Sequence, residues 1–486
     1  MTIKTNFLFS GVLMTLAACA AGPDFKTPAA PKAETYTANN EAVPLNQRVL
    51  MGKQIQAEWW TLFSSDALND LIHQAVENNY DLASARETLA QAEEAVKAKS
   101  GSLLPQLSIG ATAGRQEYGV ALFGPSDFNI PPFSYYEVGP SVSWTPDIFG
   151  GGQREVERQK AMANYQANET AAFYITLTGD TVSAALEMSS AKAEIEAIDQ
   201  IIADDKKNLA MVQDSYSIGA SSKLDILGAQ GQLMDDQSML PAVEQRSSLS
   251  RHALSIYVGN TPSNWIAPNL NFENFTLPQE LPLSLPSELV KRRPDILAAE
   301  ENLHAASAAI GVASANFYPQ LTLTANMMQE ALTPAGIFSA ANNAWSLAAG
   351  LTAPIFNGGT LTANKREAEH AFQAALAQYQ QTILVAFKQV ADALTSLAHD
   401  DEEAVILNNA LTTATTTLEA MRDSYQAGAI GKLQLHDSER AEITARLAVI
   451  RAQHQRFLDC VRLFVALGGS PISSIHHNWI ITGHQR

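Results

Sequence analysis

The sequence predicts an α+β membrane protein with an internal twofold repeat, four β-strands and two long antiparallel helical hairpins in each chain. Three observations support this prediction: short motifs that recur in the same order, four segments with period-two alternation, and proline-free segments with helical periodicity. The composition agrees, because 46% of the 486 residues are hydrophobic but only 7% are aromatic. Such a mixture favours long, closely packed helices over a bulky globular core.

The charge and the cysteine content exclude several classes of function. Thirty-two basic residues stand against fifty acidic ones, which gives a formal net charge of −18 and predicts no nucleic-acid partner. The two cysteines, Cys19 and Cys460, are too few for a disulfide framework and lie in no metal-binding spacing. The chain also lacks the short motifs of metalloproteases, serine hydrolases, dinucleotide-binding folds and P-loop NTPases. We therefore expect a protein that is not an enzyme and binds no metal or diffusible cofactor.

The N-terminal segment is predicted to be a lipoprotein signal peptide at 1–18, followed by a lipidated tether and belt segment at 19–58. An uncharged run at 5–18 is too short to span a membrane and is followed directly by Cys19 in the sequence Leu-Ala-Ala-Cys. This ending is similar to a bacterial lipobox, which implies cleavage before Cys19 and a covalent lipid on it. The proline-rich stretch at 22–44 is typical of an extended tether. An ordinary signal peptide with a chance cysteine is the alternative.

Four short motifs occur twice in the same order, which indicates an internal duplication. The four pairs are 104–107 with 318–321, 148–151 with 355–358, 214–219 with 423–428, and 258–262 with 467–471. The segment from Pro105 to Phe149 is seven residues longer than its counterpart, which predicts one longer loop in the first half. We expect four further regions: a first structural repeat at 59–262, an inter-repeat linker at 263–287, a second structural repeat at 288–471 and a C-terminal tail at 472–486.

Each half is predicted to begin with a helix and to continue with two β-strands. The first helices are expected at 66–100 and 294–316. Apolar and polar residues then alternate in four segments, which are 107–113, 138–144, 321–327 and 345–351. Alternation of this kind is typical of transmembrane β-strands with one apolar and one polar face. Pro140 inside the second segment weakens its assignment.

A very long helix and an antiparallel return helix are predicted after each pair of strands. Apolar residues between 372 and 397 recur at a mean spacing near 3.6, and no proline lies between Pro354 and Pro471. Each long helix ends at a Tyr-x-x-Gly turn. The long helices are expected at 153–218 and 360–427, and the return helices at 224–257, with a kink at Pro241, and at 433–467.

Neither the strands nor the hairpins form a complete structure within one chain. Four strands leave two edges whose backbone groups are unpaired, and lipid does not tolerate such edges. Two long helical hairpins likewise lack a common core. Both deficits predict an oligomer whose subunits together build one β-barrel and one helical tube.

The chain resembles the TolC-like outer-membrane factors, and among them the lipidated OprM/NodT type of efflux outer-membrane channel. The resemblance is carried by Trp59-Trp60 and by 288–296, 299–300, 310–313 and 317–321. It implies a homotrimer of TolC-like fold, with a twelve-stranded barrel in the outer-membrane lipid of a Gram-negative bacterium and an α-barrel in the periplasm. It also implies that the channel passively conducts drugs or other small molecules delivered by a periplasmic membrane-fusion adaptor and an inner-membrane efflux pump.

Two other functions are compatible with parts of the sequence. A type I protein-secretion outer channel shares the fold, but the lipobox-like ending and the Arg-Arg-Pro-Asp motif at 292–295 argue against it. The other alternative is a lipid-anchored periplasmic coiled-coil protein that binds partners and conducts nothing. Four alternating strands have no use in such a protein.

Arg292, Arg293, Pro294 and Asp295 form a family motif for which we expect a structural role. Pro294 suits the first turn of a helix, and Asp295 suits the positive end of the helix dipole. Phosphate binding by the two arginines is the alternative, but no glycine-rich loop accompanies them.

The resemblance implies a periplasmic gate near the Tyr-x-x-Gly turns. Asp225 follows Gly219 by six residues and Asp437 follows Gly428 by nine, at positions where the family has constricting acidic residues. Gln434 departs from that pattern, since some members carry a second aspartate there. A ring of carboxylates contributed by several copies narrows a pore and attracts cations.

Six residues are expected at the hairpin tips, where the resemblance implies contact with the adaptor. They are Tyr216, Gly219, Lys223, Tyr425, Gly428 and Lys432. The two lysines could pair with neighbouring carboxylates. As the alternative, they are solvated charges that contribute almost nothing to stability.

Overall fold

The computed structural model describes residues 21–31, 33, 35–37, 48–53, 55–117 and 131–469. The expectations for the signal peptide, for Cys19 and for the tail at 472–486 lie outside these residues. The chain divides into two compact units. The strand unit comprises 1–28, 88–166 and 299–379, and the hairpin unit comprises 29–87, 167–298 and 380–486.

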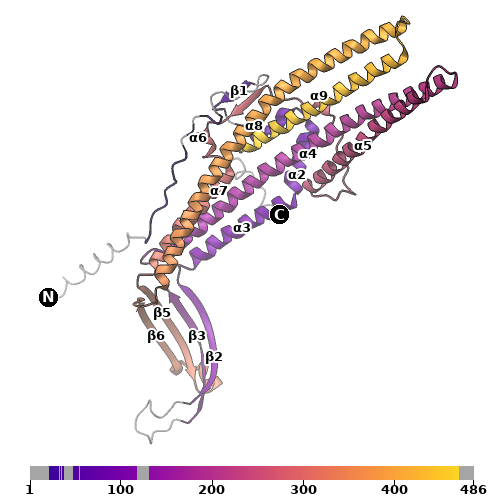
Figure 1. Cartoon of the computed structure of the whole chain (residues 1–486). Coiled ribbons are helices and arrows are strands. Elements are labelled where there is room, and N and C mark those ends of the chain that lie inside the picture. Colours follow the sequence, from indigo (N-terminus) through magenta and orange to yellow (C-terminus); the bar gives the residue numbers. More distant parts are fainter. Residues whose placement is uncertain are drawn as a thin grey trace. The chain divides into compact units, whose positions relative to one another are not determined.

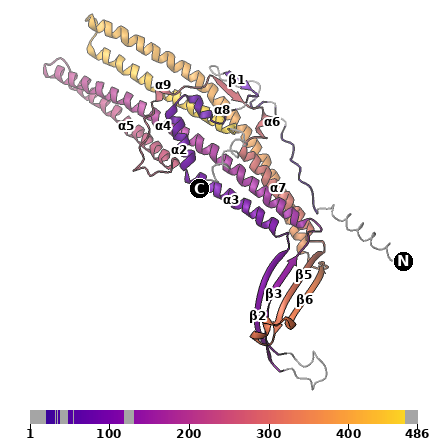
Figure 2. The ribbon, with the colours of Figure 1, turned by 180° about the vertical axis from the view of Figure 1, so that it is seen from behind.

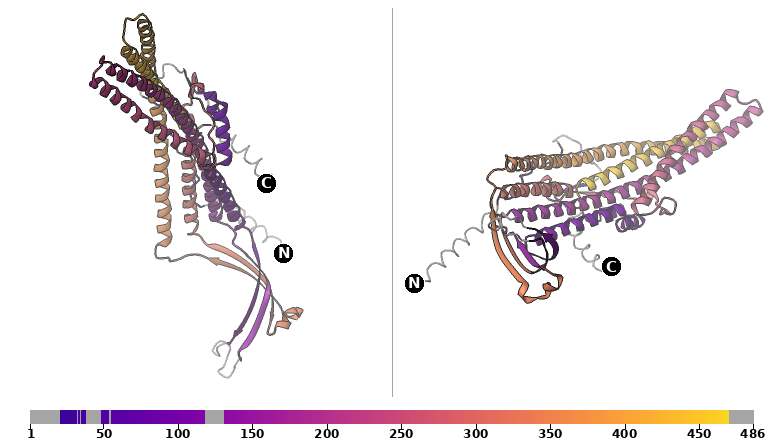
Figure 3. Two further views of the ribbon diagram at one scale, coloured as in Figure 1. Left: turned by 90° about the vertical axis from the view of Figure 1, so that its right-hand side faces the viewer. Right: turned by 90° about the horizontal axis from the view of Figure 1, so that it is seen from below.

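The strand unit contains a four-stranded antiparallel sheet with the order β2-β3-β5-β6 (Figure 1). The strands are β2 (Gln106–Gln116), β3 (Phe133–Trp144), β5 (Gln320–Ala331) and β6 (Asn343–Thr352). All four strands expected from the alternating pattern are therefore present. β2 and β6 form the two edges of this sheet, and the strands bend along their length (Figure 3).

The register places the apolar positions of the four strands on one face of the sheet. Leu107 lies opposite Val142, Val142 opposite Ala325, and Ala325 opposite Leu347. Leu351 joins this face because side chains two residues apart point the same way. Leu107, Leu347 and Leu351 are 73%, 76% and 69% exposed. A single chain therefore leaves an apolar sheet face uncovered.

Two pairs of long helices follow the strands. α4 (Gly151–Ser217) and α8 (Thr360–Gln426) have 67 residues each, and α5 (Lys223–Tyr257) and α9 (Lys432–Ala466) have 35 each. At about 1.5 Å per residue, the longer helices extend about 100 Å. In the described part of the chain, no helix combines the length and apolar character needed to cross a membrane. Both views in Figures 1 and 2 show α5 beside α4 and α9 beside α8, so each pair forms the expected antiparallel hairpin.

Two prolines lie inside regular elements. Pro140 of β3 lies opposite Ile109 of β2, but the ladder between β3 and β5 skips it, because proline has no N–H to donate. α5 includes Pro241 and remains one helix on both sides of it. Neither proline ends its element.

The starts of the elements show how the two halves correspond. The sequence distance from the first residue of α3 (Tyr80–Gly101) to the first residue of α7 (Pro294–Ala315) equals the distance from the first residue of β2 to that of β5. We call this distance the first offset. The distance from the first residue of α4 to that of α8 likewise equals the distance from α5 to α9. We call this distance the second offset. The second offset is shorter by five residues, so the connection between β2 and β3 is five residues longer than the one between β5 and β6.

The expected difference of seven residues, which aligns Phe149 with Phe356, is wrong by two. Gly150 and Gly359, which the second offset relates, both have a left-handed backbone, with φ of 74° and 89°. Glycine adopts this conformation at little cost, so these two residues mark equivalent turns before α4 and α8. Phe356 is accordingly 92% exposed, whereas Phe149 stacks on Tyr318 with ring centroids 4.8 Å apart.

The single helix expected at 66–100 consists of two helices. α2 (Asp66–Asn78) ends before Asn79, which has an extended backbone with ψ of 124°. The Asn79 side chain accepts a hydrogen bond of 2.9 Å from the Leu82 backbone N–H and donates one of 3.2 Å to the Tyr257 carbonyl. Asn79 therefore caps α3, and this side-chain competition with helical hydrogen bonding separates the two helices.

Short elements complete the fold. In the hairpin unit, β1 (Arg48–Met51) pairs in parallel with β4 (Glu280–Leu283). The other short elements of this unit are η1 (Trp59–Phe63), η3 (Phe272–Asn274) and α6 (Pro286–Leu289). In the strand unit, η4 (Pro334–Phe338) and η5 (Ala340–Asn342) lie between β5 and β6.

The core of the hairpin unit contains the Trp59-Trp60 pair. Trp59, Trp60 and Phe63 are 1%, 1% and 0% exposed. Measured between ring centroids, Trp59 lies 5.3 Å from Phe464 and Phe63 lies 5.7 Å from Phe457. Burial of each such ring contributes about 2–3 kcal/mol, so this cluster fastens η1 to α9.

Candidate functional site

Each hairpin tip is closed by the same hydrogen-bonded turn. In the first tip, the Gly219 N–H donates to the Tyr216 carbonyl at 3.0 Å, and the Ala220 N–H donates to the Ser215 carbonyl at 2.8 Å. The second tip repeats both bonds at 3.0 and 2.9 Å around Gly428. This Schellman arrangement needs a left-handed residue, and Gly219 and Gly428 have φ of 76° and 72°. The Tyr-x-x-Gly pattern thus encodes the turn itself.

The other residues expected at the tips lie beside these turns. Tyr216 and Tyr425 are 48% and 39% exposed. Lys223 and Lys432 are the exposed first residues of α5 and α9. Their exposure favours the alternative of solvated charges over buried ion pairs.

Asp225 and Gln434 occupy the same capping position in the two hairpins and are related by the second offset. The Asp225 carboxylate accepts from the Ser222 backbone N–H at 2.7 Å and from the Ser222 hydroxyl at 2.8 Å. The Gln434 side-chain oxygen accepts from the Gly431 backbone N–H at 2.7 Å. The bonds from Ser222 hold the pKa of Asp225 below its usual range. A carboxylate is not required for this cap, which explains how glutamine replaces it.

Asp437 has a different environment from Asp225. It is exposed and lies on α9 one turn beyond Gln434. Its counterpart in the first hairpin, at the second offset, is Gly228. The pKa of Arg440 is raised by its bond to Asp236 and, to a smaller extent, by the charge of Asp437. Of the two gate candidates, Asp437 is therefore the one whose carboxylate is not part of a helix cap.

Four ionisable residues connect the two hairpins, and we call them the seam network: Asp205 of α4, Asp236 of α5, and His436 and Arg440 of α9. Arg440 donates to Asp236 through two bonds of 2.8 and 3.0 Å. His436 Nε2 lies 3.2 Å from an Asp205 carboxylate oxygen. Gln232 donates a further bond of 3.0 Å to Asp236. The seam network therefore ties α9 of the second hairpin to both helices of the first.

Burial gives the seam network unusual electrostatics. Asp205, Asp236 and His436 are 2%, 3% and 6% exposed. Burial, and then the neighbouring Asp236, raise the pKa of Asp205 to about 6, against the opposing charges of His436 and Arg440. Burial also acts to raise the pKa of Asp236, but the bonds from Arg440 and other donors bring that pKa below its usual range. Asp205 is therefore the member of the pair that takes up a proton near neutral pH.

A second cluster of charged residues, around the buried Glu194, links the same three helices. The Glu194 carboxylate accepts from Arg246 at 2.7 Å and from Arg451 at 2.8 Å. Arg246 also donates to Glu187, whose other oxygen lies 3.3 Å from His454 Nε2. A buried carboxylate without such partners is costly, so the two arginines explain how Glu194 is tolerated. Apolar side chains pack between these helices as well and include Ile198, Ile201, Val243, Ile443 and Leu447.

No short motif in the sequence singles out the seam network. Asp236 and Arg440 are separated by 204 residues in the chain. One signal is present in the comparison of the two halves. Asp205 and Asp236 correspond to Ala414 and Ala445, so the two acidic residues occur in one half only.

Arg293 holds the start of α7 in the hairpin unit. Its guanidinium donates to Asp295 at 2.8 Å, to the last carbonyl of α9 at 2.8 Å and to the Gln389 side chain. Pro294 is the first residue of α7, and Arg292 beside this site is half-buried. These contacts engage all three guanidinium nitrogens of the buried Arg293, so they favour the structural role over phosphate binding.

The first described residues are docked within the strand unit. The Ala21 N–H donates to the Phe149 carbonyl at 3.0 Å, and Arg154 donates to the Ala21 carbonyl at 3.2 Å. Gly22 has φ of 88°, and a Cβ atom there would lie 2.4 Å from the Gly311 Cα atom. Glycine is therefore required for this close approach of two backbones.

Side chains of the next residues strengthen this docking. Arg154 donates to Asp24 at 2.6 Å and to Glu157 at 2.7 Å. Phe25 stacks on His304, with ring centroids 4.5 Å apart and an interplanar angle of 13°. His304 Nε2 lies 2.9 Å from a Glu157 oxygen. The chain that follows Cys19 thus has a fixed place on α4 and α7.

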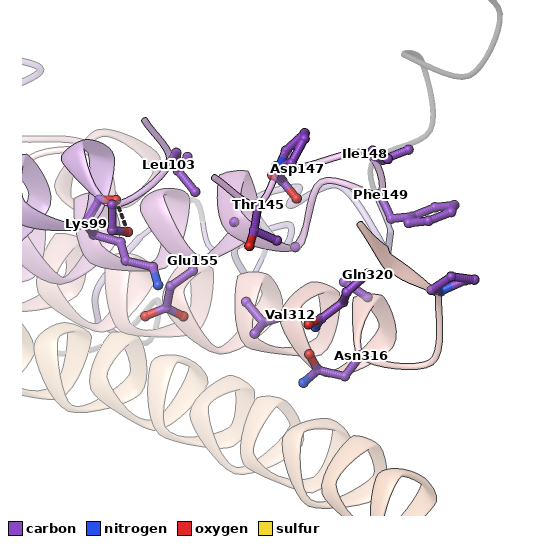
Figure 4. Close-up of a pocket in the computed structure, with 16 residues that line it drawn as sticks. Lys99, Leu103, Thr145, Asp147, Ile148, Phe149, Glu155, Val312, Asn316 and Gln320 are labelled. Carbon is purple, nitrogen blue, oxygen red and sulfur yellow. Dashed lines mark hydrogen bonds between the residues drawn. The ribbon is translucent and has the colours of Figure 1, made fainter. Parts of the chain in front are cut away.

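A pocket of about 390 Å³ lies in the strand unit where the strands meet the helices (Figure 4). Lys99 and Glu155 lie close together at one end of it. The pKa of Glu155 is lowered, first by its bond from Arg158 and to a smaller extent by the charge of Lys99. The Asp147 carboxylate accepts from the Gln153 N–H at 2.7 Å. Among the described residues, no group of three His, Cys, Asp or Glu side chains is placed to hold a metal ion.

These features define the class of protein. A sheet with two open edges is joined to two very long helical hairpins, and a helix, two strands, a long helix and a return helix follow in this order in each half of the chain. This is the subunit architecture of a TolC-like channel.

The chain belongs to the outer membrane efflux protein family, whose model matches residues 71–260 and 285–469. It is 30% identical over 465 residues to the outer membrane protein OprJ of Pseudomonas aeruginosa, with 94% of each chain covered. It is 28% identical to the cation efflux system protein CusC of Escherichia coli O157:H7, with 94% of this chain and 97% of that protein covered.

A solved structure agrees with the fold. The open state of the Neisseria gonorrhoeae MtrE outer membrane channel matches with a TM-score of 0.77 at 25% identity, over 93% of this chain and 98% of that one. The chain is therefore an outer-membrane efflux channel protein of TolC-like fold.

Proposed function

We propose that three copies of this chain form the outer-membrane conduit of a tripartite efflux system. In this proposal, a periplasmic membrane-fusion adaptor and an inner-membrane pump deliver drugs or other small molecules to the conduit. The conduit passes them to the cell exterior without catalysing a reaction. The relatives include a cation efflux protein and a toluene efflux protein, so we propose small molecules as the cargo and no single chemical class.

The open sheet supports this proposal more than any other observation. Its edge strands β2 and β6 each have one side without a partner strand in the described structure, and its exposed face is apolar. A sheet in lipid avoids unpaired edges by closing on itself. Pairing β6 of each copy with β2 of the next closes the ring, and three copies supply twelve strands, which is within the range of membrane barrels.

The hairpins support the same assembly. They expose apolar side chains that another copy can cover, which include Leu224 at 78%, Leu227 at 53% and Ile406 at 67%. Monomeric water-soluble helices rarely expose residues of this size in groups. Several copies side by side build a helical tube from such surfaces.

We also propose that Cys19 carries the covalent lipid. Ala21, two residues after Cys19 in the sequence, is held by the Phe149 carbonyl just before α4 begins. Cys19→Ser should abolish the lipid mass on the mature N-terminal peptide in mass spectrometry. A lipid mass that persists in this variant refutes the assignment.

We propose Asp437 as the main constricting carboxylate, with Asp225 as the second candidate. Three copies of the exposed Asp437 would form an acidic ring. The Asp225 carboxylate is bound to Ser222 in the cap of α5, so these local hydrogen bonds hold it at the start of the helix.

Reconstitution into planar lipid bilayers tests the proposed function. The purified protein should produce stepwise, ohmic conductance without any energy source. A protein that binds lipid but gives no steps would support the coiled-coil alternative instead. Deletion in the native bacterium should raise sensitivity to small toxic molecules, whereas loss of one secreted protein without such sensitivity would support the protein-secretion alternative.

A further inference from the structure

We infer that β6 of one copy pairs with β2 of a second copy in one defined register, with Leu351 opposite Ala111 of the neighbouring copy. This inference rests on the proposed homotrimer and specifies the contact that closes it. The pairing of β3 with β5 inside the chain serves as its template.

The template joins the two halves of the chain. β3 is the second strand of the first half, β5 is the first strand of the second half, and they pair antiparallel. A pair of β6 with β2 of another copy also joins a second strand to a first strand. In a closed ring, first and second halves alternate. The contact of β3 with β5 inside a chain and the contact of β6 with β2 between copies are therefore equivalent.

The strand ladders give the correspondence between the halves. Leu107 corresponds to Leu321 at the first offset, which relates β2 to β5. Leu107 lies opposite Val142, and Leu321 lies opposite Leu351. Val142 and Leu351 are therefore equivalent. They are separated by the second offset, which also relates α4 to α8 and α5 to α9, so the ladder and the helices agree.

The register between copies follows from this correspondence. Inside the chain, Val142 lies opposite Ala325. The equivalent of Val142 is Leu351, and the equivalent of Ala325 in β2, at the first offset, is Ala111. Leu351 is therefore opposite Ala111 of the neighbouring copy.

The faces of the two edge strands are consistent with this register. Leu351 lies on the exposed apolar face with Leu347, and Ala111 lies on the same face as Leu107 and Ile109, because residues two apart share a face. A shift of one residue would place apolar side chains of one copy beside polar side chains of the next. The competing registers are thus the shifts by two residues, with Leu351 opposite Ile109 or Ala113.

Disulfide trapping between copies distinguishes these registers. Three double variants carry Leu351→Cys together with Ile109→Cys, Ala111→Cys or Ala113→Cys. A disulfide needs Cα atoms about 4.4–6.8 Å apart, and a shift of two residues moves the partner by about 6.6 Å. Mild oxidation with copper phenanthroline, followed by non-reducing electrophoresis, should give covalent multimers mainly in the Ala111→Cys variant, by a factor on the order of five.

The control background keeps Cys19 for lipidation and replaces the buried Cys460 by alanine. Leu351→Cys alone should give no covalent multimers. Stronger trapping with Ile109→Cys or Ala113→Cys overturns the register and leaves the trimer intact. Absence of trapping in all three variants, in protein that has the mass of a trimer, also overturns it. A monomeric mass overturns the proposed function itself.

Discussion

The two hairpins share a backbone but differ in chemistry. Their long helices have 67 residues each and their return helices 35 each, and the same glycine turn closes both tips. The charged residues do not follow this symmetry. Asp205 and Asp236 of the seam network correspond to Ala414 and Ala445 of the second hairpin.

The same contrast holds on the other side of the seam. His436 and Arg440 correspond to Leu227 and Gly231 in the first hairpin. A contact between copies that uses these equivalent positions would therefore be apolar, whereas the contact inside one chain is ionic. Duplication has preserved the features that determine helix length and turn type, whereas the four residues of the seam network have no ionisable counterparts in the other half.

Among the variants that test this comparison, removal of Arg440 should have the largest effect on stability. Arg440→Ala leaves Asp236 buried without its two bonds to the guanidinium, and the free energy of unfolding should fall by about 3 kcal/mol. Denaturant titration followed by circular dichroism measures this loss.

A matched control uses an exposed arginine. Arg422 lies 3.8 Å from Glu439 with both side chains partly exposed, so Arg422→Ala should cost less than about 0.5 kcal/mol. The double variant Asp236→Leu with Arg440→Leu should recover most of the stability, because no charge is left buried. Equal losses for Arg440→Ala and Arg422→Ala would show that the seam network does not hold the hairpins together.

The second prediction concerns pH and Asp205. Its pKa is raised from 3.8 to about 6, so its ionised form lowers stability above pH 6, and this cost disappears as the pH falls toward 4. Asp205→Asn resembles the protonated form. It should be more stable than the native chain at pH 8, by about 2 kcal/mol, with the difference closing as the pH falls toward 4. Melting temperatures at both pH values measure the difference.

Asp236 provides a control for which the opposite change in stability is expected. Its pKa is lowered, so its ionised form contributes stability that is present above pH 3.8 and is lost as the pH falls through the folded-state pKa. Asp236→Asn should therefore be less stable than the native chain at pH 8, with a smaller deficit in acid. Effects of the same sign for Asp205→Asn and Asp236→Asn would contradict the assigned charge states.

The third prediction separates the turn glycines from a helix glycine. Gly219 and Gly428 have a left-handed backbone, and nothing lies within 4 Å of an added Cβ, so alanine should cost about 1 kcal/mol through backbone strain alone. Gly228 inside α5 is equally open, and Gly228→Ala should raise stability by about 0.5–1 kcal/mol. If the melting temperature shifts in the same direction for all three variants, the turn assignment is refuted.

The smallest effect is expected at the pore. If the proposed acidic ring exists, Asp437→Ala removes it and should raise single-channel conductance by a factor on the order of two, with a weaker preference for cations. Gln434→Asp adds a second ring and should strengthen that preference. Bilayer recordings measure both, and an unchanged conductance in Asp437→Ala removes this residue from the gate.

The sequence predicts the elements of this fold closely, because each has a local pattern. The bounds of α4, α5, α8 and α9 follow from helical periodicity and from glycine turns, and the four strands follow from alternation. The break at Asn79 is marked only by a single asparagine inside a helical pattern, which is a weak signal; its side chain caps α3 through Leu82 and also bonds to Tyr257, which is distant in the sequence. The seam network leaves no local pattern either, because its members meet only after two hairpins have packed together.

The candidate site shows the same division. Gly219 and Gly428 are predictable because a left-handed turn needs glycine, and Ser222 with Asp225 three residues later has the spacing of a capping box, which the structure forms. The parallel pairing of β1 with β4 joins segments that are far apart in the sequence, and neither segment has a distinctive pattern.

The detergent-corrected mass of the purified mature protein, measured by light scattering, tests the channel most directly. We predict three times the mass of one chain, because a closed ring pairs every edge strand and three is the number of copies that the family resemblance implies. A monomer that persists after gentle extraction would leave β2 and β6 unpaired in lipid and would contradict the assembly on which conduction depends.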